Sequence, residues 1–211
     1  VLLSLALNFQ TFVFEPGNEL PYVLYLPSYA ATAWYHGRLA EPIESLEELL
    51  EDTQEHNVRQ TVFVECTSMY RVDGPEDLRV VGETEFVQGV AAKSASGQYG
   101  ETRVATGIVG SANLLLGDHV APVLEAQLAA SPQRFRGIRH RAAWAEPPVV
   151  ASRPAGPEHL LLDADFRRGY AHLRTYGLSF EGWVYHTHIT DLADLAGATP
   201  HRSRLRGRDM V

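Results

Sequence analysis

The sequence predicts an α/β fold in which about four parallel strands, each followed by an amphipathic helix, form part of a (β/α)8 barrel. Apolar strand-like runs recur about four times between Thr61 and Ala196, and a helical pattern follows each run. The length of the chain is the second observation. A closed (β/α)8 barrel usually needs roughly 250 residues, whereas this chain has 211. We therefore expect a partial barrel that follows an irregular N-terminal segment.

The expected strands share an apolar centre, and most of them end in a polar or ionisable residue. They cover residues 61–66, 103–110, 135–140 and 179–186, and the helical runs cover 83–94, 118–130, 163–176 and 190–196. A shorter amphipathic helix is expected from Glu44, where leucines recur at helical spacing. The carboxyl ends of parallel strands carry the chemistry of such folds, so functional residues are sought there.

The chain divides into three stretches by pattern. Residues 1–43 are aromatic and interrupted by proline, with an expected strand near residues 1–8 and an expected short helix at 30–36. Residues 44–196 carry the strand and helix repeat. Residues 197–211 form a basic tail without a hydrophobic pattern.

Composition narrows the class of protein. The formal net charge of −8 argues against a nucleic-acid partner, because phosphate contacts need a basic surface. The sequence contains no apolar run long enough to span a membrane and no pattern of a signal peptide. The single cysteine, Cys66, excludes an intramolecular disulfide, and we expect a cytoplasmic protein.

The N-terminal stretch resembles a known family. The run VLLSLALNFQT at 1–11 and the run PGNELPYVLYLPSYAATAWYH at 16–36 are similar to an internal piece of bacterial serine-carboxypeptidase-like proteins. In that family the nucleophile lies in a Gly-x-Ser-x-Gly turn, and no such turn occurs in this sequence. The resemblance therefore implies no catalytic residue, and a serine-hydrolase mechanism is disfavoured.

A second resemblance covers about residues 44–196. The runs HNVRQTVFVECTSMYRVDGPE at 56–76, VGETEF at 81–86, RVATGIVG at 103–110, RFRGIRH at 134–140 and LLLDADFRRG at 160–169 are similar to amidohydrolase-related proteins of the pyrone-dicarboxylate lactonase type. The resemblance implies a (β/α)8 hydrolase that opens lactones, amides or related carbonyl compounds, with a divalent metal such as Zn or Mn in some members.

Two parts of the family pattern are missing. The first strand of the family carries a His-x-His-x-Trp-like motif, and here the carboxypeptidase-like stretch stands in its place. The family's Asp-His pair and late catalytic Asp have no counterpart after Ala196. From this we expect a chimeric or truncated reading frame that keeps the middle strands of the barrel and has impaired activity.

Two histidines are the candidate metal ligands. His186 and His188 stand two apart at the end of an expected strand, so their imidazoles would share one face and could meet one metal ion. The family resemblance supports His186 as a metal-binding or catalytic residue. A hydrogen-bonded structural histidine is the alternative at both positions.

Other candidates lie at the ends of two expected strands. Arg139 is the candidate to bind a substrate carboxylate, with Arg136 and His140 beside it, and the odd offset would place the two arginines on opposite faces. A salt bridge to a neighbouring helix is the alternative. Glu65 could accept a proton or orient a ligand, or it could pair with Arg71 or Arg139. Cys66 fits a buried packing thiol.

The sequence thus leaves two main hypotheses for function. The first is an amidohydrolase-related hydrolase acting on a small carbonyl substrate. The second is a half-barrel without catalysis that forms a homo-oligomer through its open sheet edges.

Overall fold

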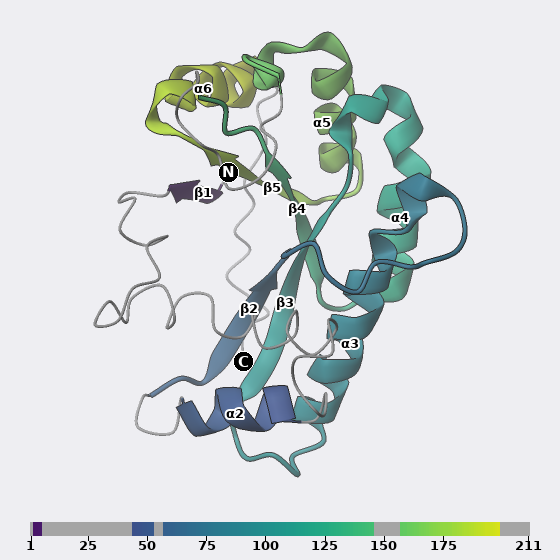
Figure 1. Ribbon diagram of the computed structural model, residues 1–211, viewed down its shortest axis with the longest axis vertical. Coiled ribbons are helices and arrows are strands. Elements are labelled where there is room, and N and C mark those ends of the chain that lie inside the picture. The colour runs from purple at the N-terminus through teal and green to yellow at the C-terminus, as the bar shows by residue number, and fades with distance from the viewer. Residues whose placement is uncertain (1, 6–43, 53–56, 146–156, 199–211) are drawn as a thin grey trace.

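Five parallel strands form one sheet in the part of the chain that the structure describes. The computed structural model describes residues 2–5, 44–52, 57–145 and 157–198. The strands are β1 (Leu2–Leu5), β2 (Gln60–Val64), β3 (Arg103–Ser111), β4 (Phe135–Arg141) and β5 (Ser179–Val184), in the spatial order β1-β5-β4-β3-β2. Strands β2 to β5 follow one another in both chain and space, and the sheet curls as half of a barrel would (Figure 1). The predicted partial (β/α)8 barrel is confirmed.

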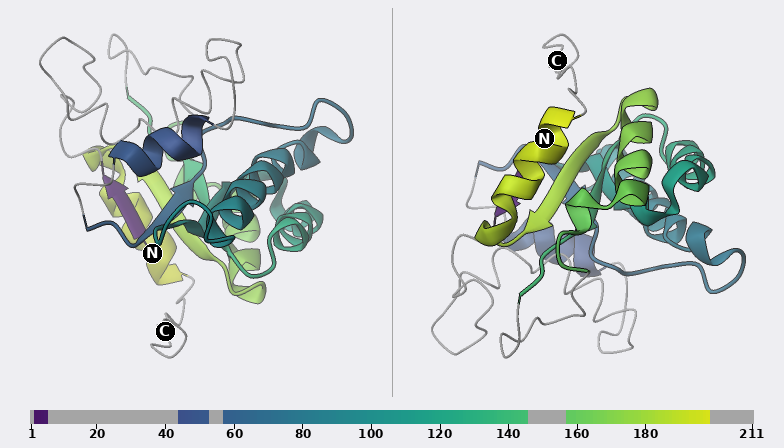
Figure 2. Two further views of the ribbon diagram at one scale, coloured as in Figure 1. Left: turned by 90° about the horizontal axis from the view of Figure 1, so that it is seen from below. Right: turned by 90° about the horizontal axis from the view of Figure 1, so that it is seen from above.

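A helix follows each of the strands β2 to β5. The α-helices are α2 (Glu44–Asp52), α3 (Val81–Ala95), α4 (Ala121–Ala130), α5 (Ala164–Thr175) and α6 (Ile189–Ala198), and the short 3₁₀ helices are η2 (Glu76–Leu78), η3 (Leu114–Val120), η4 (Leu160–Leu162) and η5 (His186–His188). Figure 2 shows α3, α4 and α5 along one face of the sheet and α6 beside β5. None of the helices within the described ranges is long and apolar enough to cross a membrane.

The expected helix boundaries differ from the structure mainly before α4. The expected helix at 118–130 begins at Ala121, because the preceding residues form η3. Gly117 interrupts η3 with φ +55 and ψ −127, a conformation that glycine adopts readily. The expected helix at 30–36 and the tail from residue 199 lie outside the described residues.

The N-terminal stretch contributes a strand to the same sheet. Strand β1 pairs in parallel with β5, with Leu2 beside Glu181 and Leu5 beside Val184. The strand expected near residues 1–8 is therefore present at Leu2–Leu5. This pairing places residues 2–5 next to the last strand of the βα repeat.

The hydrophobic core lies between the sheet and its helices. The strands contribute Ile108, Phe135, Ile138 and Phe180, each at most 2% exposed. Facing them are Val87 and Ala91 of α3, Val123 and Leu124 of α4, and Phe166, Tyr170 and Leu173 of α5. Phe166 and Tyr170 meet the ring of Phe180 edge to face, with centroids 6.2 and 5.2 Å away. Burying one face in this way leaves the other face of the sheet to carry polar side chains.

Helix α5 approaches η3 at a glycine. Gly169 is buried, and a Cβ atom at this position would lie 2.1 Å from the carbonyl oxygen of Leu114. Backbone atoms form the obstacle, so no side chain can move away to relieve the contact. The close packing of α5 onto the segment after β3 therefore requires glycine at this position.

We expect Gly169→Ala to lower the free energy of unfolding by about 1–3 kcal/mol, because the added methyl group overpacks a rigid contact. Gly89 in α3 is the matched control, since it is exposed and a Cβ there would meet nothing within 4 Å. Gly89→Ala should raise stability by about 0.5–1 kcal/mol through helix propensity. Urea denaturation followed by circular dichroism measures both variants. Equal stability of the two variants would contradict the close approach.

Candidate functional site

Polar side chains from three neighbouring strands lie side by side on one face of the sheet. In the strand register Ser111 of β3 lies beside Arg139 of β4, which lies beside Glu181 of β5. Paired residues of parallel strands project from the same face of a sheet. The phenol of Tyr70, in the loop after β2, hydrogen-bonds to the Ser111 side chain. We call Tyr70, Ser111, Arg139 and Glu181 the polar row.

The polar row lies on the sheet face opposite the helices. The residues that alternate with it along β4 and β5, namely Ile138, His140 and Phe180, point to the helical side. Ile138 and Phe180 are core residues, and the ring of His140 lies edge to face with Phe166 of α5 at 5.0 Å. The polar row therefore faces the inner side of the half-barrel, where ligands of complete barrels bind near the strand ends.

An ion pair forms the centre of the polar row. Nε of Arg139 donates to Oε1 of Glu181 at 2.9 Å, and Nη2 of Arg139 donates to the same oxygen. The two side chains are only 13% and 10% exposed. Trp183 lies beside this pair, with the guanidinium of Arg139 5.3 Å from its ring centroid and that of Arg141 at 5.0 Å. These contacts hold the Arg139 guanidinium in a fixed position.

A side chain of helix α4 holds the backbone of Ser111 in place. The Nε2 group of the fully buried Gln127 donates to the carbonyl oxygen of Ser111 at 2.8 Å. Asn113 then begins η3, where its side chain accepts a hydrogen bond from the Leu115 amide. The end of β3 is thus held by one side-chain contact from α4 and by the phenol of Tyr70.

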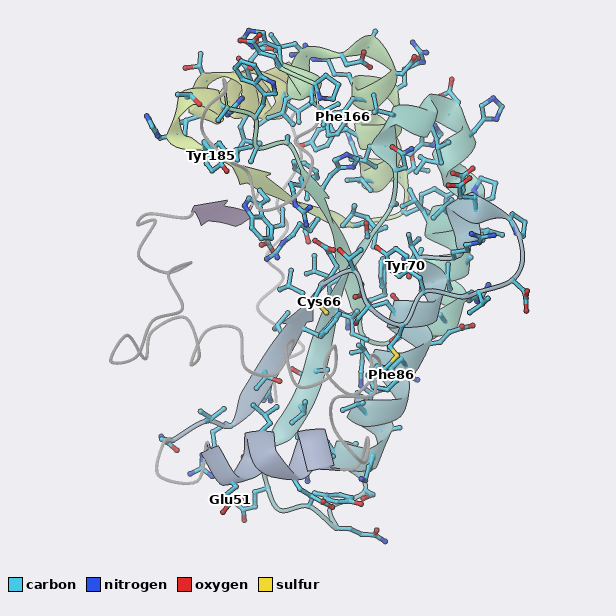
Figure 3. The ribbon with its side chains drawn as sticks, in the orientation of Figure 1. Glu51, Cys66, Tyr70, Phe86, Phe166 and Tyr185 are labelled. Atoms are coloured by element: carbon cyan, nitrogen blue, oxygen red, sulfur yellow. The ribbon has the colours of Figure 1, made fainter. Side chains whose placement is uncertain are left out.

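The residues at the end of β2 surround a buried carboxyl group. Figure 3 shows Cys66 at the tip of β2 and Tyr70 farther along the loop that leads to α3. Glu83 in the first turn of α3 accepts hydrogen bonds from the amides of Cys66 at 3.0 Å and Ser68 at 2.8 Å. Burial raises the pKa of the Glu83 carboxyl, and the nearby Glu65 carboxylate raises it further.

Glu65 and Cys66 lie next to this carboxyl group. Glu65 is 7% exposed, and its amide donates to the carbonyl oxygen of Val109 at 2.8 Å. The arginines considered as its partners have other partners, because Arg71 pairs with Glu85 and Arg139 pairs with Glu181. Burial raises the pKa of the Cys66 thiol to about 12, with the Glu83 carboxylate adding to the effect. The thiol is therefore protonated at neutral pH, as expected for a packing cysteine.

The structure separates Arg136 and His140 from Arg139. A register shift in the β3–β4 pairing, where Ile108 pairs with Phe135 and Val109 with Gly137, leaves Arg136 without a partner position at the amino end of β4. The expectation that Arg136 and Arg139 lie on opposite faces assumed strict alternation along the strand. The register shift interrupts this alternation, so the expectation does not apply at Arg136. Arg136 is exposed, and its guanidinium donates to backbone carbonyls of Phe135 and Gln133.

His140 faces the helical side rather than the polar row. Its Nδ1 atom lies 3.1 Å from the carbonyl oxygen of Ala112. Burial lowers the pKa of His140 to about 4, so the ring is neutral at physiological pH. A neutral imidazole packed on Phe166 supports the end of β4 and does not line the face that Arg139 occupies.

The expected common face of His186 and His188 is wrong. Strand β5 ends at Val184, and His186–His188 form η5. A 3₁₀ helix has about three residues per turn, so residues two apart point in different directions. His186 is exposed, whereas His188 is buried with its Nδ1 3.1 Å from the hydroxyl of Thr187.

The two candidate metal ligands lie in different environments. Within residues 44–52, 57–145 and 157–198 no group of three His, Cys, Asp or Glu side chains is arranged to hold a metal ion. His186 is exposed, whereas His188 is buried.

Comparison with protein-family models, with curated proteins and with solved structures gives no match for this chain.

Glu181, Glu83 and Tyr70 were not identified as site residues from the sequence. Glu181 carried a usable signal, because a lone carboxylate inside an apolar strand needs a buried partner. Glu83 carried none, since an acidic residue in the first turn of a helix is ordinarily explained by the helix dipole. Tyr70 lies in a loop with no periodic pattern, and only the folded structure brings it to Ser111.

We expect Glu181→Ala to cost about 2–4 kcal/mol of unfolding free energy, because it leaves the Arg139 guanidinium largely buried without its carboxylate. The double variant Arg139→Met/Glu181→Leu should recover most of this loss, since no unpaired charge remains. Glu101→Ala is the control: it removes the exposed Arg59–Glu101 pair, whose side chains are 70% and 89% exposed, and should cost less than about 1 kcal/mol. Denaturant titration gives all three values. A double variant no more stable than Glu181→Ala would contradict this reading of the pair.

Proposed function

We propose that this chain is a half-barrel of the amidohydrolase-related type that binds a small carbonyl compound bearing carboxylate groups, and that its own hydrolytic activity is weak or absent. The observation that carries the proposal is the Arg139–Glu181 pair in the polar row, on the inner face near the carboxyl end of β4 and in the middle of β5. The single cysteine is compatible with the cytoplasm as the compartment.

Arg139 supplies the binding chemistry in this proposal. A guanidinium carries five N–H donors, and the contacts to Glu181 use Nε and Nη2, so donors remain for a ligand carboxylate or carbonyl oxygen. Contacts with Glu181 and Trp183 already restrict the Arg139 side chain, so it loses less conformational entropy when a ligand binds. The planar ring of Trp183 offers a surface against which a flat ligand can pack.

Weak hydrolysis follows from the placement of the candidate proton-transfer groups. A general base must lie within hydrogen-bond reach of the proton it takes. Glu65 and Glu83 are buried at the end of β2, and His140 points to the helices. His186, which the family resemblance implicates in polarising the carbonyl, is exposed in η5 beyond the end of β5. The polar row alone therefore supports binding better than turnover.

A pyrone dicarboxylate tests the proposed binding. We expect isothermal titration calorimetry to give a dissociation constant of about 1 mM or tighter for the purified chain, equivalent to about −4 kcal/mol. Arg139→Met/Glu181→Leu should weaken binding at least about tenfold, the effect of losing a charge-assisted contact. Arg136→Met should bind as the unaltered chain does, because Arg136 lies at the amino end of β4.

Hydrolysis is followed in the same samples through the ultraviolet absorbance of the pyrone. Absence of binding by the unaltered chain, or equal weakening by the Arg136 variant, would overturn the binding proposal. Rapid ring opening that is lost in His186→Ala would contradict the proposed weak activity.

Self-association is the second candidate function, and it has support of its own. Strand β2 forms one edge of the sheet, and Val62 in that strand is 60% exposed. An exposed apolar residue on an edge strand favours pairing with a further strand.

We expect sedimentation velocity to show a dimer whose fraction increases with protein concentration. Val62→Lys should shift the equilibrium to the monomer, because a charge on an edge strand opposes pairing. Val72→Lys is the control, since Val72 is 78% exposed in the loop before η2 and lies outside the edge. A monomer at every concentration would exclude this second function.

A further inference from the structure

The loop between β2 and α3 has an unusual backbone. Thr67 and Met69 have positive φ values of 63° and 54°, although neither is glycine. Such conformations cost free energy and persist where the surrounding structure enforces them. The two residues flank Ser68, whose amide points to Glu83. The hydrogen bond from Ser68 to Glu83 is therefore the contact that we expect to hold Thr67 and Met69 in these conformations.

One oxygen of Glu83 organises this loop. Oε1 of Glu83 accepts hydrogen bonds from the amides of Cys66 and Ser68, from the Ser68 hydroxyl at 3.3 Å and from the Cys66 thiol at 3.4 Å. Gly82 allows the loop to come this close, because a Cβ there would lie 2.4 Å from the carbonyl oxygen of Met69. The first turn of α3 thus serves as the support on which the loop is folded.

The second oxygen of Glu83 is buried and unpaired. Glu83 is 1% exposed, and its Oε2 has no hydrogen-bond partner among the described residues. A buried carboxylate with one bare oxygen is costly, which agrees with the raised pKa of this group. The acceptor oxygen, rather than a negative charge, is what the loop requires.

The loop carries Tyr70 to the polar row. The Tyr70 phenol hydrogen-bonds to the side chains of Thr67 and Ser111. Its pKa is raised, first by burial and then by the Glu83 and Glu65 carboxylates, so the phenol keeps its proton. Thr67 therefore connects the strained backbone that Glu83 holds with the hydroxyl that contacts Ser111.

We propose that Glu83 is a positioning residue for the ligand site: through the loop of residues 66–70 it holds the Tyr70 phenol against Ser111, next to Arg139. The inference rests on the proposed ligand site for its functional consequence. Its structural part, the dependence of Tyr70 on Glu83, can be tested without a ligand.

Four variants test this dependence: Glu83→Gln, Glu83→Ala, Tyr70→Phe and the double variant Glu83→Ala/Tyr70→Phe. Glutamine keeps an acceptor oxygen, so we expect Glu83→Gln to bind the pyrone dicarboxylate within threefold of the unaltered chain. Glu83→Ala and Tyr70→Phe should each weaken binding about tenfold, the size of one lost hydrogen bond to a ligand or its support. The double variant should bind no more weakly than the weaker single variant, because both changes remove the same contact.

A purely structural role for Glu83 gives a different pattern. The losses of the two single variants would then multiply in the double variant, and Glu83→Gln would not restore binding at temperatures where all variants are folded. Either result would overturn the proposal.

Hydrogen exchange separates this proposal from the proposed function. In Glu83→Ala the amides of Cys66 and Ser68 should exchange at least tenfold faster than in Glu83→Gln, with core amides of β3 unchanged. The effects of Glu83→Ala and Tyr70→Phe on the unfolding equilibrium should also be coupled by threefold or more. If the unaltered chain does not bind the pyrone dicarboxylate, the proposed function fails. The positioning role of Glu83 is then decided by amide hydrogen exchange and by the coupling of Glu83→Ala and Tyr70→Phe in the unfolding equilibrium. Unchanged exchange, or independent effects on unfolding, would overturn it.

Discussion

The register of the parallel strands is the constraint on which the site depends. Because β3, β4 and β5 pair in parallel, residues from three separate parts of the chain lie side by side, with Ser111 next to Arg139 and Arg139 next to Glu181. A shift of one strand by a single residue would turn its side chains to the other face. The core side chains Ile138 and Phe180 fix the register, because they would leave the core after such a shift.

The two faces of the sheet therefore have different roles. The helical face is apolar and supplies the burial that stabilises the fold, and the neutral ring of His140 is packed there against Phe166. The inner face carries an ion pair that burial alone would not favour, since removing charges from water is costly. Placing Arg139 and Glu181 together offsets that cost and leaves a guanidinium in a fixed position. The N–H donors of Arg139 that do not contact Glu181 are the groups we propose for binding a ligand.

Much of the fold could be predicted from the sequence, because it follows from periodic patterns that are local. Strands β2 to β5 and the helices after them begin and end close to the expected residues. The site was harder to predict from the sequence, because its contacts join residues that are far apart in the chain. Arg139 was correctly placed at a strand end, but its partner Glu181 is 42 residues away. The strand expected at 179–186 ends at Val184. His186 and His188 therefore lie in the 3₁₀ helix η5, where residues two apart point in different directions.

We propose a ligand site on the inner face of β3 to β5, around Ser111, Arg139 and Glu181. Nuclear magnetic resonance of the ¹⁵N-labelled chain during titration with a pyrone dicarboxylate shows whether a ligand binds there. We expect saturable shifts of the amides of Ser111, Arg139 and Glu181 and of the Trp183 indole. The amides on the outer side of α4 and α5 should not move. Shifts confined to η5 and α6, or no saturable shifts at any site, would rule out a ligand site on this face.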